Sequence, residues 1–165
     1  MPRHQTPGLG PERAQKIAEE CYSEVLSYCR RHAPAGHEAS DLAQEAFLRF
    51  VRSQGYRERG RPIAYLMRIA RSVCVDASRE KRLETVPLDF DVAVEGDEEP
   101  GAELDAALSA LPCELREAIE LRYGSGLGVS EVACVLGISR FAARRRINAA
   151  LRLLGDELRG GDPDD

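Results

Sequence analysis

Four arginine side chains gather near the C-terminal end of the chain, and their type and spacing suit nucleic-acid chemistry. The four are Arg140, Arg144, Arg145 and Arg146. A guanidinium group is a planar fork of hydrogen-bond donors, so it binds phosphate and can bond guanine at two atoms at once. From Ser139 to Leu154 the chain has five arginines and no acidic residue. This local positive charge favours DNA binding over the alternative that the arginines only solvate a helix.

The residues just before these arginines predict the element that positions them. Apolar residues at three- and four-residue spacing indicate a short amphipathic helix, and they are Val132, Val135 and Leu136. Gly137 is expected to end that helix, because glycine reaches a left-handed backbone cheaply. Ser139 is a favourable N-cap for a second helix that carries the arginines. Together they predict a helix-turn-helix, whose second helix enters the DNA major groove.

A second cluster of polar side chains lies in the N-terminal half of the chain. It consists of Asp41, Gln44, Glu45 and Arg49. Their spacing of three and four residues predicts one polar stripe along a helix over residues 38–53. The apolar side chains of the same helix are expected to face inward, and they are Leu42, Ala46, Phe47 and Phe50. The stripe is either a docking face for a protein or a solvated helix surface.

A third cluster is basic and belongs to a helix predicted over residues 62–81, which opens with a favourable first-turn proline. Its inner face is formed by Leu66, Ile69, Ala70, Val73 and Ala77. The basic side chains of the segment are Arg61, Arg68, Arg71, Arg79, Lys81 and Arg82. They suit a surface that follows a phosphate backbone, with a solvated face as the alternative.

No motif in the chain predicts catalysis or a resident cofactor. The sequence has no glycine-rich phosphate loop, no His-Glu-x-x-His and no nucleophile elbow, so we expect no catalytic residue. The five cysteines are scattered and are interpreted as reduced thiols packed in helices. A metal site could draw on Cys21, Cys29, His32 and His37. Their spacing matches no known site type, so the sequence predicts no metal.

The charge pattern divides the chain into two parts. The net charge is −5, but nine acidic residues and no Lys or Arg lie between Leu83 and Asp105. Proline and glycine interrupt this acidic stretch, so residues 83–102 are predicted to be a flexible linker. The linker separates two small helical domains, expected over residues 12–82 and 103–159. Residues 1–11 and 160–165 are expected to be disordered.

The predicted fold class is therefore all-α. The first domain begins with a helix over 11–32 that places Ile17, Cys21, Val25 and Cys29 on one face. Helices over 103–110, 113–123, 129–136 and 140–157 build the second domain. No apolar stretch approaches the roughly 20 residues that a membrane span requires. Nothing at the N-terminus resembles a signal peptide, so a cytoplasmic protein without membrane insertion is expected.

Several of these segments, in this order, resemble a known family. The sequence Asp41-Leu42-Ala43-Gln44-Glu45-Ala46-Phe47, the run from Ala64 to Arg71, and Leu111-Pro112 leading to the helix-turn-helix look like a bacterial RNA polymerase sigma factor. The short layout of two domains is similar to the extracytoplasmic-function group. The resemblance covers residues 14–82 and 103–154. It implies a region 2-like domain of three to four helices and a region 4-like helix-turn-helix domain.

The resemblance also implies roles for residues. The polar stripe would dock on the clamp helices of the largest subunit of core RNA polymerase. The second domain would dock on the flap of the polymerase. The minus-thirty-five element would be read by Arg140, Ala142, Arg144, Arg145 and Arg146. Within that set we expect Arg144 to read a base and Arg145 to hold phosphate. The minus-ten element would be bound by Arg68 and Arg71 and by a pocket for a flipped base formed by Tyr56, Ile69, Ser72 and Asp76.

Two positions of that pocket depart from the family's common pattern. Ser72 stands where asparagine is frequent, and Tyr56 stands where phenylalanine is frequent. In the second domain, Gly128 stands at a usual N-cap serine, and Cys134 stands where a charged residue is frequent and is expected to be exposed. The shorter Ser72 side chain leaves the identity of the flipped base open.

The implied function is a transcription initiation factor that brings core RNA polymerase to promoter DNA and helps to melt it. An anti-sigma protein is a further candidate partner. One alternative is a helix-turn-helix regulator with the same layout that forms no holoenzyme. Another is a mimic whose sigma-like face sequesters a regulator. A repressor would not need the Asp41–Phe47 stripe and a mimic would not need Arg144–Arg146, so the presence of both favours the initiation factor.

Overall fold

The computed structural model describes residues 10–53, 61–84 and 101–160. Every regular element in these residues is a helix, which confirms the predicted all-α class. Contacts divide the chain into two compact units, residues 1–88 and 89–165. Three predicted segments lie largely outside the described residues. They are the linker, the N-terminal segment apart from residues 10–11, and the tail after residue 160. No described helix is long and apolar enough to cross a membrane.

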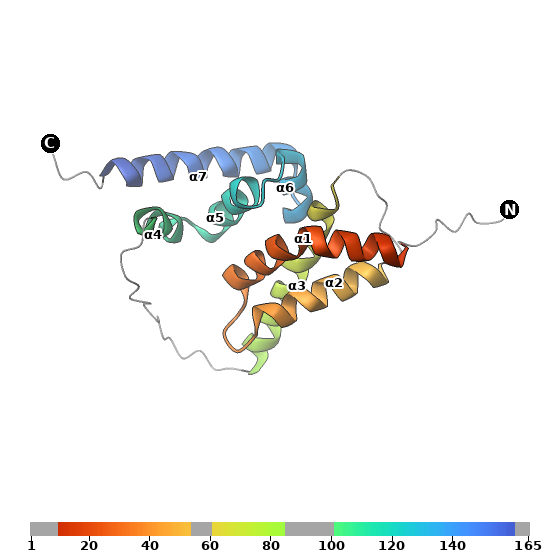
Figure 1. Ribbon diagram of the computed structural model, residues 1–165. Coiled ribbons are helices and arrows are strands. Elements are labelled where there is room, and N and C mark those ends of the chain that lie inside the picture. Colours follow the sequence, from red (N-terminus) through yellow and green to blue (C-terminus); the bar gives the residue numbers. More distant parts are fainter. Residues whose placement is uncertain (1–9, 54–60, 85–100, 161–165) are drawn as a thin grey trace. The chain divides into compact units, whose positions relative to one another are not determined.

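The first unit is a bundle of three helices that all pack against one another (Figure 1). They are α1 (Pro11–His32), α2 (Ala39–Arg52) and α3 (Pro62–Glu84). The bounds of α1 agree with the prediction, while α3 runs three residues beyond the predicted Lys81. At that end the Lys81 Nζ donates a hydrogen bond to the Ala35 carbonyl at 2.8 Å. This bond ties the last turns of α3 to the loop between α1 and α2.

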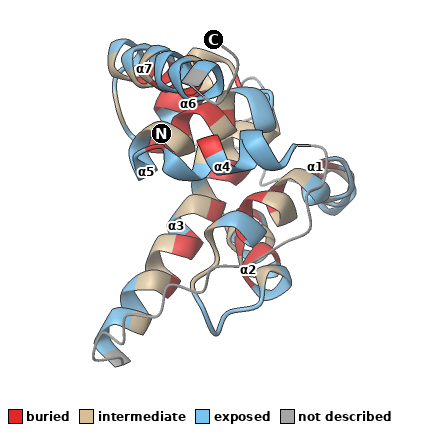
Figure 2. Cartoon of the chain, turned by 90° about the vertical axis from the view of Figure 1, so that its left-hand side faces the viewer, coloured by how far each residue is buried: buried red, intermediate tan, exposed pale blue. Residues whose placement is uncertain are grey.

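The core of the first unit lies where the three helices face one another (Figure 2). Its fully buried large side chains are Ile17, Val25, Tyr28, Phe50, Leu66 and Met67. Two predicted core residues are only half-buried, Phe47 and Ile69. Phe47 stacks on Tyr22 of α1 with ring centroids 5.8 Å apart, so it covers the edge of the bundle. The burial of a Leu, Ile or Phe side chain contributes about 1.5–3 kcal/mol each, which makes this core the main source of stability.

The second unit is built around one long helix. Its elements are α4 (Ala102–Ala110), α5 (Cys113–Ile119), η1 (Glu120–Gly124), α6 (Val129–Leu136) and α7 (Arg140–Gly160). The helix α7 packs on α4, α5 and α6. One cluster of its core joins Ala107, Leu111 and Ile119 to Ala150 and Leu154 of α7. The arginines at the start of α7 are thereby fixed to a buried framework.

One predicted element of this unit is wrong. The sequence predicts a single α-helix over residues 113–123, but the chain widens into a π-helical turn from Glu120 to Gly124. The Ser125 N–H donates to the Glu120 carbonyl at 3.0 Å, a step of five residues. Leu121 and Leu127 are both fully buried. The wider turn delivers both leucines to the core before the chain enters α6.

Candidate nucleic-acid interface

The turn between α6 and α7 has the geometry that the sequence predicted. Gly137 ends α6 with φ 66° and ψ 34°, the left-handed conformation that favours glycine. The next residue, Ile138, donates its N–H to the Ala133 carbonyl at 3.0 Å. Ser139 then caps α7, because its Oγ accepts a hydrogen bond from the Ala142 N–H at 3.0 Å. These contacts fix the direction in which α7 leaves the turn.

The start of α6 is held in a similar way. Gly128 occupies the N-cap, and its N–H donates to the Glu131 carboxylate at 2.8 Å. The glycine has no side chain to cap the helix, so the glutamate carboxylate supplies a side-chain contact at this end. Val132, Val135 and Leu136 are buried as predicted, and Cys134 is exposed as predicted. The helix-turn-helix therefore forms as the sequence indicates.

The first turns of α7 separate a buried face from an exposed one. Ala143 and Ile147 are buried against the rest of the unit. Successive helix residues are about 100° apart, which places Phe141 and Arg145 roughly opposite that buried pair. Arg140 and Arg144 are exposed along one flank. The exposed face is therefore made of guanidinium groups around one aromatic ring.

The four arginines of α7 are not equivalent. Arg146 has only 28% of its side chain exposed, and its Nη2 lies 3.5 Å from the Glu114 carboxylate of α5. Among the described residues, no carboxylate pairs with the other three, Arg140, Arg144 and Arg145. Arg146 therefore braces α7 against α5, while the other three guanidinium groups keep their charge available for a ligand. Ala142, also predicted at this interface, is half-buried.

Phe141 is a residue of this face that the sequence analysis missed. It is 71% exposed, and the guanidinium carbon of Arg145 lies 5.2 Å from its ring centroid. The available signal was its position directly after the first arginine, in a turn where the neighbouring alanines show the inward face. That position alone does not predict whether the Phe141 side chain is buried or exposed, because its exposure depends on how α7 packs on α5 and α6.

The helix α3 carries the residues predicted for the minus-ten element. Arg68 and Ser72 are exposed, while Ile69, Arg71 and Asp76 are half-buried. Tyr56 lies outside the described residues. The other five members of the set all belong to α3, and at about 100° per residue all except Arg71 fall on one side of it. Ser72 and Asp76 are four residues apart and therefore neighbours along α3.

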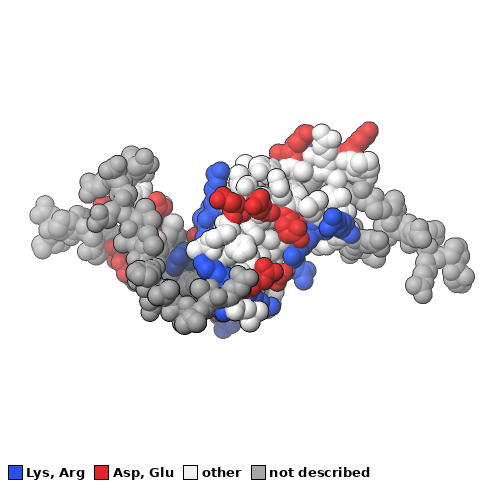
Figure 3. All heavy atoms as spheres, turned by 90° about the horizontal axis from the view of Figure 1, so that it is seen from below, with Lys and Arg blue, Asp and Glu red and all other residues white. Residues whose placement is uncertain are grey.

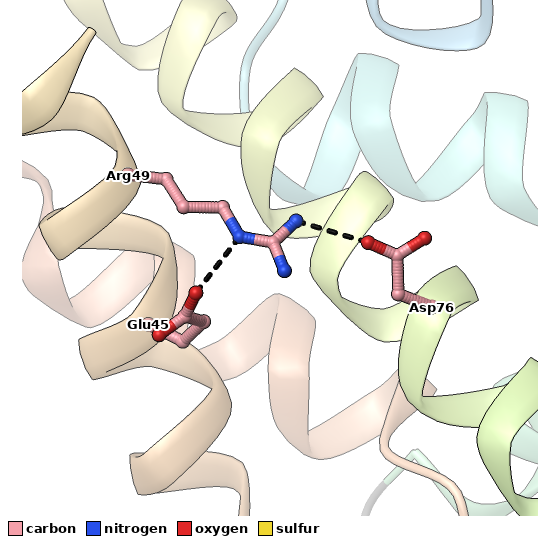
Figure 4. Close-up of polar contacts among 3 residues, drawn as sticks. All are labelled: Glu45, Arg49 and Asp76. Atoms are coloured by element: carbon pink, nitrogen blue, oxygen red, sulfur yellow. Dashed lines mark hydrogen bonds and ion pairs between the residues drawn. The ribbon is translucent and has the colours of Figure 1, made fainter.

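The polar stripe of α2 has a contact that reaches α3. The Arg49 Nε donates to Glu45 at 2.9 Å, and its Nη1 donates to Asp76 at 3.0 Å (Figure 4). These hydrogen bonds, first that to Glu45 and then that to Asp76, raise the pKa of the Arg49 guanidinium. Asp41 and Gln44 of the same stripe are exposed. Arg49, predicted for one partner, is thus paired with Asp76, predicted for another.

This pairing links two surfaces that the sequence analysis treated as separate. The three side chains are 40–44% exposed, so the stabilisation from the two ion pairs is small, about 0–1 kcal/mol each. Their effect is geometric, because one guanidinium holds the Asp76 carboxylate in place. Figure 3 shows acidic and basic side chains side by side on the described surface in that view. Local arrangement, rather than net charge, distinguishes the faces of the protein.

The cysteines and histidines considered as metal ligands have other contacts in the structure. Cys21 and Cys29 are buried on the inner face of α1, and His32 stacks on Tyr28 with ring centroids 4.3 Å apart. Burial raises the pKa of the Cys21 thiol, while a hydrogen bond with Cys74 lowers that of Cys29. Within residues 10–53, 61–84 and 101–160, no group of three or more His, Cys, Asp or Glu side chains is placed to hold a metal ion.

Comparison with known proteins gives matches over both units. The family model for Sigma-70 region 2 matches residues 17–84, and that for Sigma-70, region 4 matches residues 101–154. The sigma factor CarQ of Myxococcus xanthus is 31% identical over 167 residues, which cover 89% of this chain and 94% of CarQ. The extracytoplasmic-function sigma factor SigE of Mycolicibacterium smegmatis is 34% identical over 134 residues. That match covers 74% of this chain and about half of SigE, 52%.

Two solved structures share the fold. CnrH, in complex with the cytosolic domain of CnrY, superimposes with a TM-score of 0.67 at 22% identity and covers 93% of this chain and 92% of its own. The sigma factor RpoE from Bartonella quintana, in complex with the anti-sigma factor NepR, gives a TM-score of 0.68 at 18% identity and covers 88% and 96%. At these identities the likeness concerns the arrangement of helices.

Proposed function

Since the chain belongs to the extracytoplasmic-function group of the sigma-70 family, we propose that its two units have different tasks. A member of this family is a transcription initiation factor and not an enzyme. The first unit binds core RNA polymerase and the minus-ten element. The second unit places the polymerase on the minus-thirty-five element. We infer the residues for each task from the contacts and exposure described above.

The minus-thirty-five element is assigned to the exposed face of α7. The observation that carries this assignment is the set of three exposed guanidinium groups without a carboxylate partner among the described residues, on a helix capped and oriented by Gly137 and Ser139. Arg144 reads a base edge and Arg145 holds phosphate. Arg140 and Ala142 complete the contact surface. Arg146, which is braced by Glu114, contributes mainly by long-range charge.

The minus-ten element is assigned to α3. Arg68 and Arg71 attract phosphate, and Ser72 is open to a base edge. Ile69, Asp76 and Tyr56 complete the pocket for the flipped base in this proposal. Arg49 holds the Asp76 carboxylate in place, so that its oxygens can accept hydrogen bonds from a base. The pocket therefore depends on a residue of α2 as well as on α3.

Core polymerase is assigned to the polar stripe of α2. Asp41 and Gln44 are exposed and form the contact that a basic partner surface would meet first. Glu45 is shared between this surface and Arg49. In the proposal the partner surface is the clamp helices of the largest subunit, and the flap receives the second unit. Binding by α2 and DNA binding by α3 are then coupled through Arg49.

An anti-sigma protein is proposed as a further partner. Two sigma factors of the same fold were solved in complexes, one with the cytosolic domain of CnrY and one with NepR. Exposed apolar side chains that such a partner could cover are present on both units, among them Leu48 and Val51 of α2 and Leu158 of α7. We also propose that the protein acts in the cytoplasm, where polymerase and promoter DNA are found.

The charge reversal Asp41→Arg tests the assignment of α2. Asp41 is exposed, and among the described residues its side chain makes no hydrogen bond or ion pair, so the melting temperature should change little. Retention on immobilised core polymerase should fall about ten-fold or more, the range expected when like charges meet at an interface. Glu45→Arg is a less clean variant, because it also removes a partner of Arg49.

The matched control is Glu20→Arg, which reverses an exposed carboxylate on α1 outside every assigned surface. Normal retention of Glu20→Arg with weak retention of Asp41→Arg supports docking through α2. Equal retention of Asp41→Arg and the unmodified chain would remove α2 from the polymerase interface. Failure of the unmodified chain to bind core polymerase would favour the regulator that forms no holoenzyme.

A further inference from the structure

Phe141 is a large apolar side chain exposed where the recognition helix begins. It lies in the first turn of α7, and 71% of its surface is open to solvent. The exposed residues beside it on α7 are charged, namely Arg140, Arg144 and Arg145. Such a residue adds little to the core, and its ring is open to an external contact.

The surroundings of the ring are defined on two sides. The guanidinium carbon of Arg145 lies 5.2 Å from the ring centroid, a cation–π distance that restrains the ring. Arg140, Phe141 and Arg144 line an open, shallow hollow of about 260 Å³. The hollow therefore has one apolar wall, the ring, and two flanks that donate hydrogen bonds.

This combination of groups matches one base. In the major groove thymine shows a C5-methyl group beside the O4 acceptor, and the other three bases show no apolar group there. An aromatic ring is a suitable contact for the methyl, and a guanidinium is a suitable donor to an adjacent acceptor. A guanine could be bound by the arginines without any apolar contact. The apolar wall of the hollow therefore favours thymine over guanine.

We propose that Phe141 is a specificity-determining residue that reads the C5-methyl of one thymine in the minus-thirty-five element. Arg140 or Arg144 donates to an acceptor of that base or its neighbour, and Arg145 holds the ring while it binds phosphate. The inference rests on the proposed function, in which α7 reads this element. It adds the chemical identity of one base and the residue that selects it.

The second unit contains a natural control for the ring. Tyr123 of η1 is 59% exposed, and the guanidinium carbon of Arg122 also lies 5.2 Å from its ring centroid. The two pairs have the same chemistry, but only Phe141 belongs to α7. Removal of either ring should leave the fold intact, since both are exposed. A difference between Phe141→Ala and Tyr123→Ala therefore reports the position of the ring and not a general loss of an exposed aromatic.

The experiment compares thymine with deoxyuridine, which lacks the methyl. Holoenzyme reconstituted from the full chain and core polymerase first selects a minus-thirty-five element from a randomised library. Each thymine of that element is then replaced singly by deoxyuridine, and promoter affinity is measured. For the unmodified chain and Tyr123→Ala, one replacement should weaken binding about three- to five-fold, as loss of one buried methyl predicts. For Phe141→Ala the same replacement should have no effect.

The outcomes separate the inference about Phe141 from the assignment of α7 to the minus-thirty-five element. If the selected element holds no thymine, or no replacement weakens the unmodified chain, the inference about Phe141 is overturned. If the methyl effect persists in Phe141→Ala, another residue reads it and the inference also fails. In these cases the proposed function stands provided that Arg144→Ala still alters the selected element. If neither Arg144→Ala nor Phe141→Ala changes the element, the assignment of α7 itself fails.

Discussion

At the residue scale, the arginines of α7 are distinguished by their partners and not by their type. Arg146 is held by Glu114 at 3.5 Å, whereas Arg145 lies over Phe141 and Arg144 flanks the open hollow. A count of positive charges would treat them alike. The contacts instead separate Arg146, which is ion-paired, from Arg145, which restrains a ring, and from Arg144, which lines an open hollow.

The variants Arg144→Ala and Arg145→Ala should differ in kind. Loss of a base contact should cost about 1–3 kcal/mol and relax specificity at one or two base pairs, so Arg144→Ala should bind matched and mismatched elements more equally. Loss of a phosphate contact should weaken all sequences alike and reduce the salt slope by about one unit, as we expect for Arg145→Ala. The measurement is holoenzyme binding to matched and single-mismatch promoters across a salt series. Equal weakening of both duplexes by Arg144→Ala would make it a phosphate contact.

Ser72 gives a prediction for the other DNA surface. Ser72→Asn introduces the asparagine that is frequent at this position in the family. It changes the contacts to the edge of a base without a change of charge. We therefore predict a shift in the preferred minus-ten base with little change in overall affinity. Selection from a library randomised at the minus-ten element measures this directly. The same preferred base for both proteins would place Ser72 outside the pocket.

At the element scale, sequence patterns gave reliable helix ends where a local chemical cause exists. Pro62 at the start of α3, Gly137 at the end of α6 and Ser139 before α7 were each predicted, because proline, left-handed glycine and capping serine act within a single turn. The π-helical turn from Glu120 to Gly124 was missed. It depends on which leucines the core accepts, and that is set by the packing of other helices.

The cap of α7 gives a prediction about stability. Ser139→Ala removes the acceptor of the Ala142 N–H, so the free energy of unfolding of the second unit should fall by about 1 kcal/mol. Thermal unfolding of the full chain by circular dichroism measures the loss. Ser130→Ala is the matched control, because Ser130 is exposed within α6 and no cap depends on it. An effect of the same size in both variants would contradict the capping role.

Contacts between helices lay beyond sequence reasoning. Arg49 and Asp76 are 27 residues apart, and their hydrogen bond exists only because α2 packs on α3. The sequence placed Arg49 in a polar stripe of one helix, and the family resemblance placed Asp76 in a pocket on another. Neither could show that the two side chains meet. The same holds for Phe141, since only the packing of α7 shows which of its residues remains exposed. Periodicity predicts the faces of a helix, and tertiary packing decides what each face meets.

At the scale of the whole molecule, the charge distribution agrees with a protein that meets two kinds of partner. The acidic linker predicted over residues 83–102 carries no Lys or Arg, while α3 and α7 carry exposed arginines. This separation of charge agrees with the proposal that the protein contacts polymerase through α2 and promoter DNA through α3 and α7.

The most direct test of this account is run-off transcription with core RNA polymerase and a library of genomic promoter fragments. The unmodified chain should yield transcripts from a discrete set of fragments that share a minus-ten and a minus-thirty-five element. Asp41→Arg should abolish these transcripts, whereas Arg144→Ala should change which fragments are used. Core polymerase without the chain should yield none of them. DNA binding by the chain with no transcript from any fragment would contradict the account and favour a regulator that forms no holoenzyme.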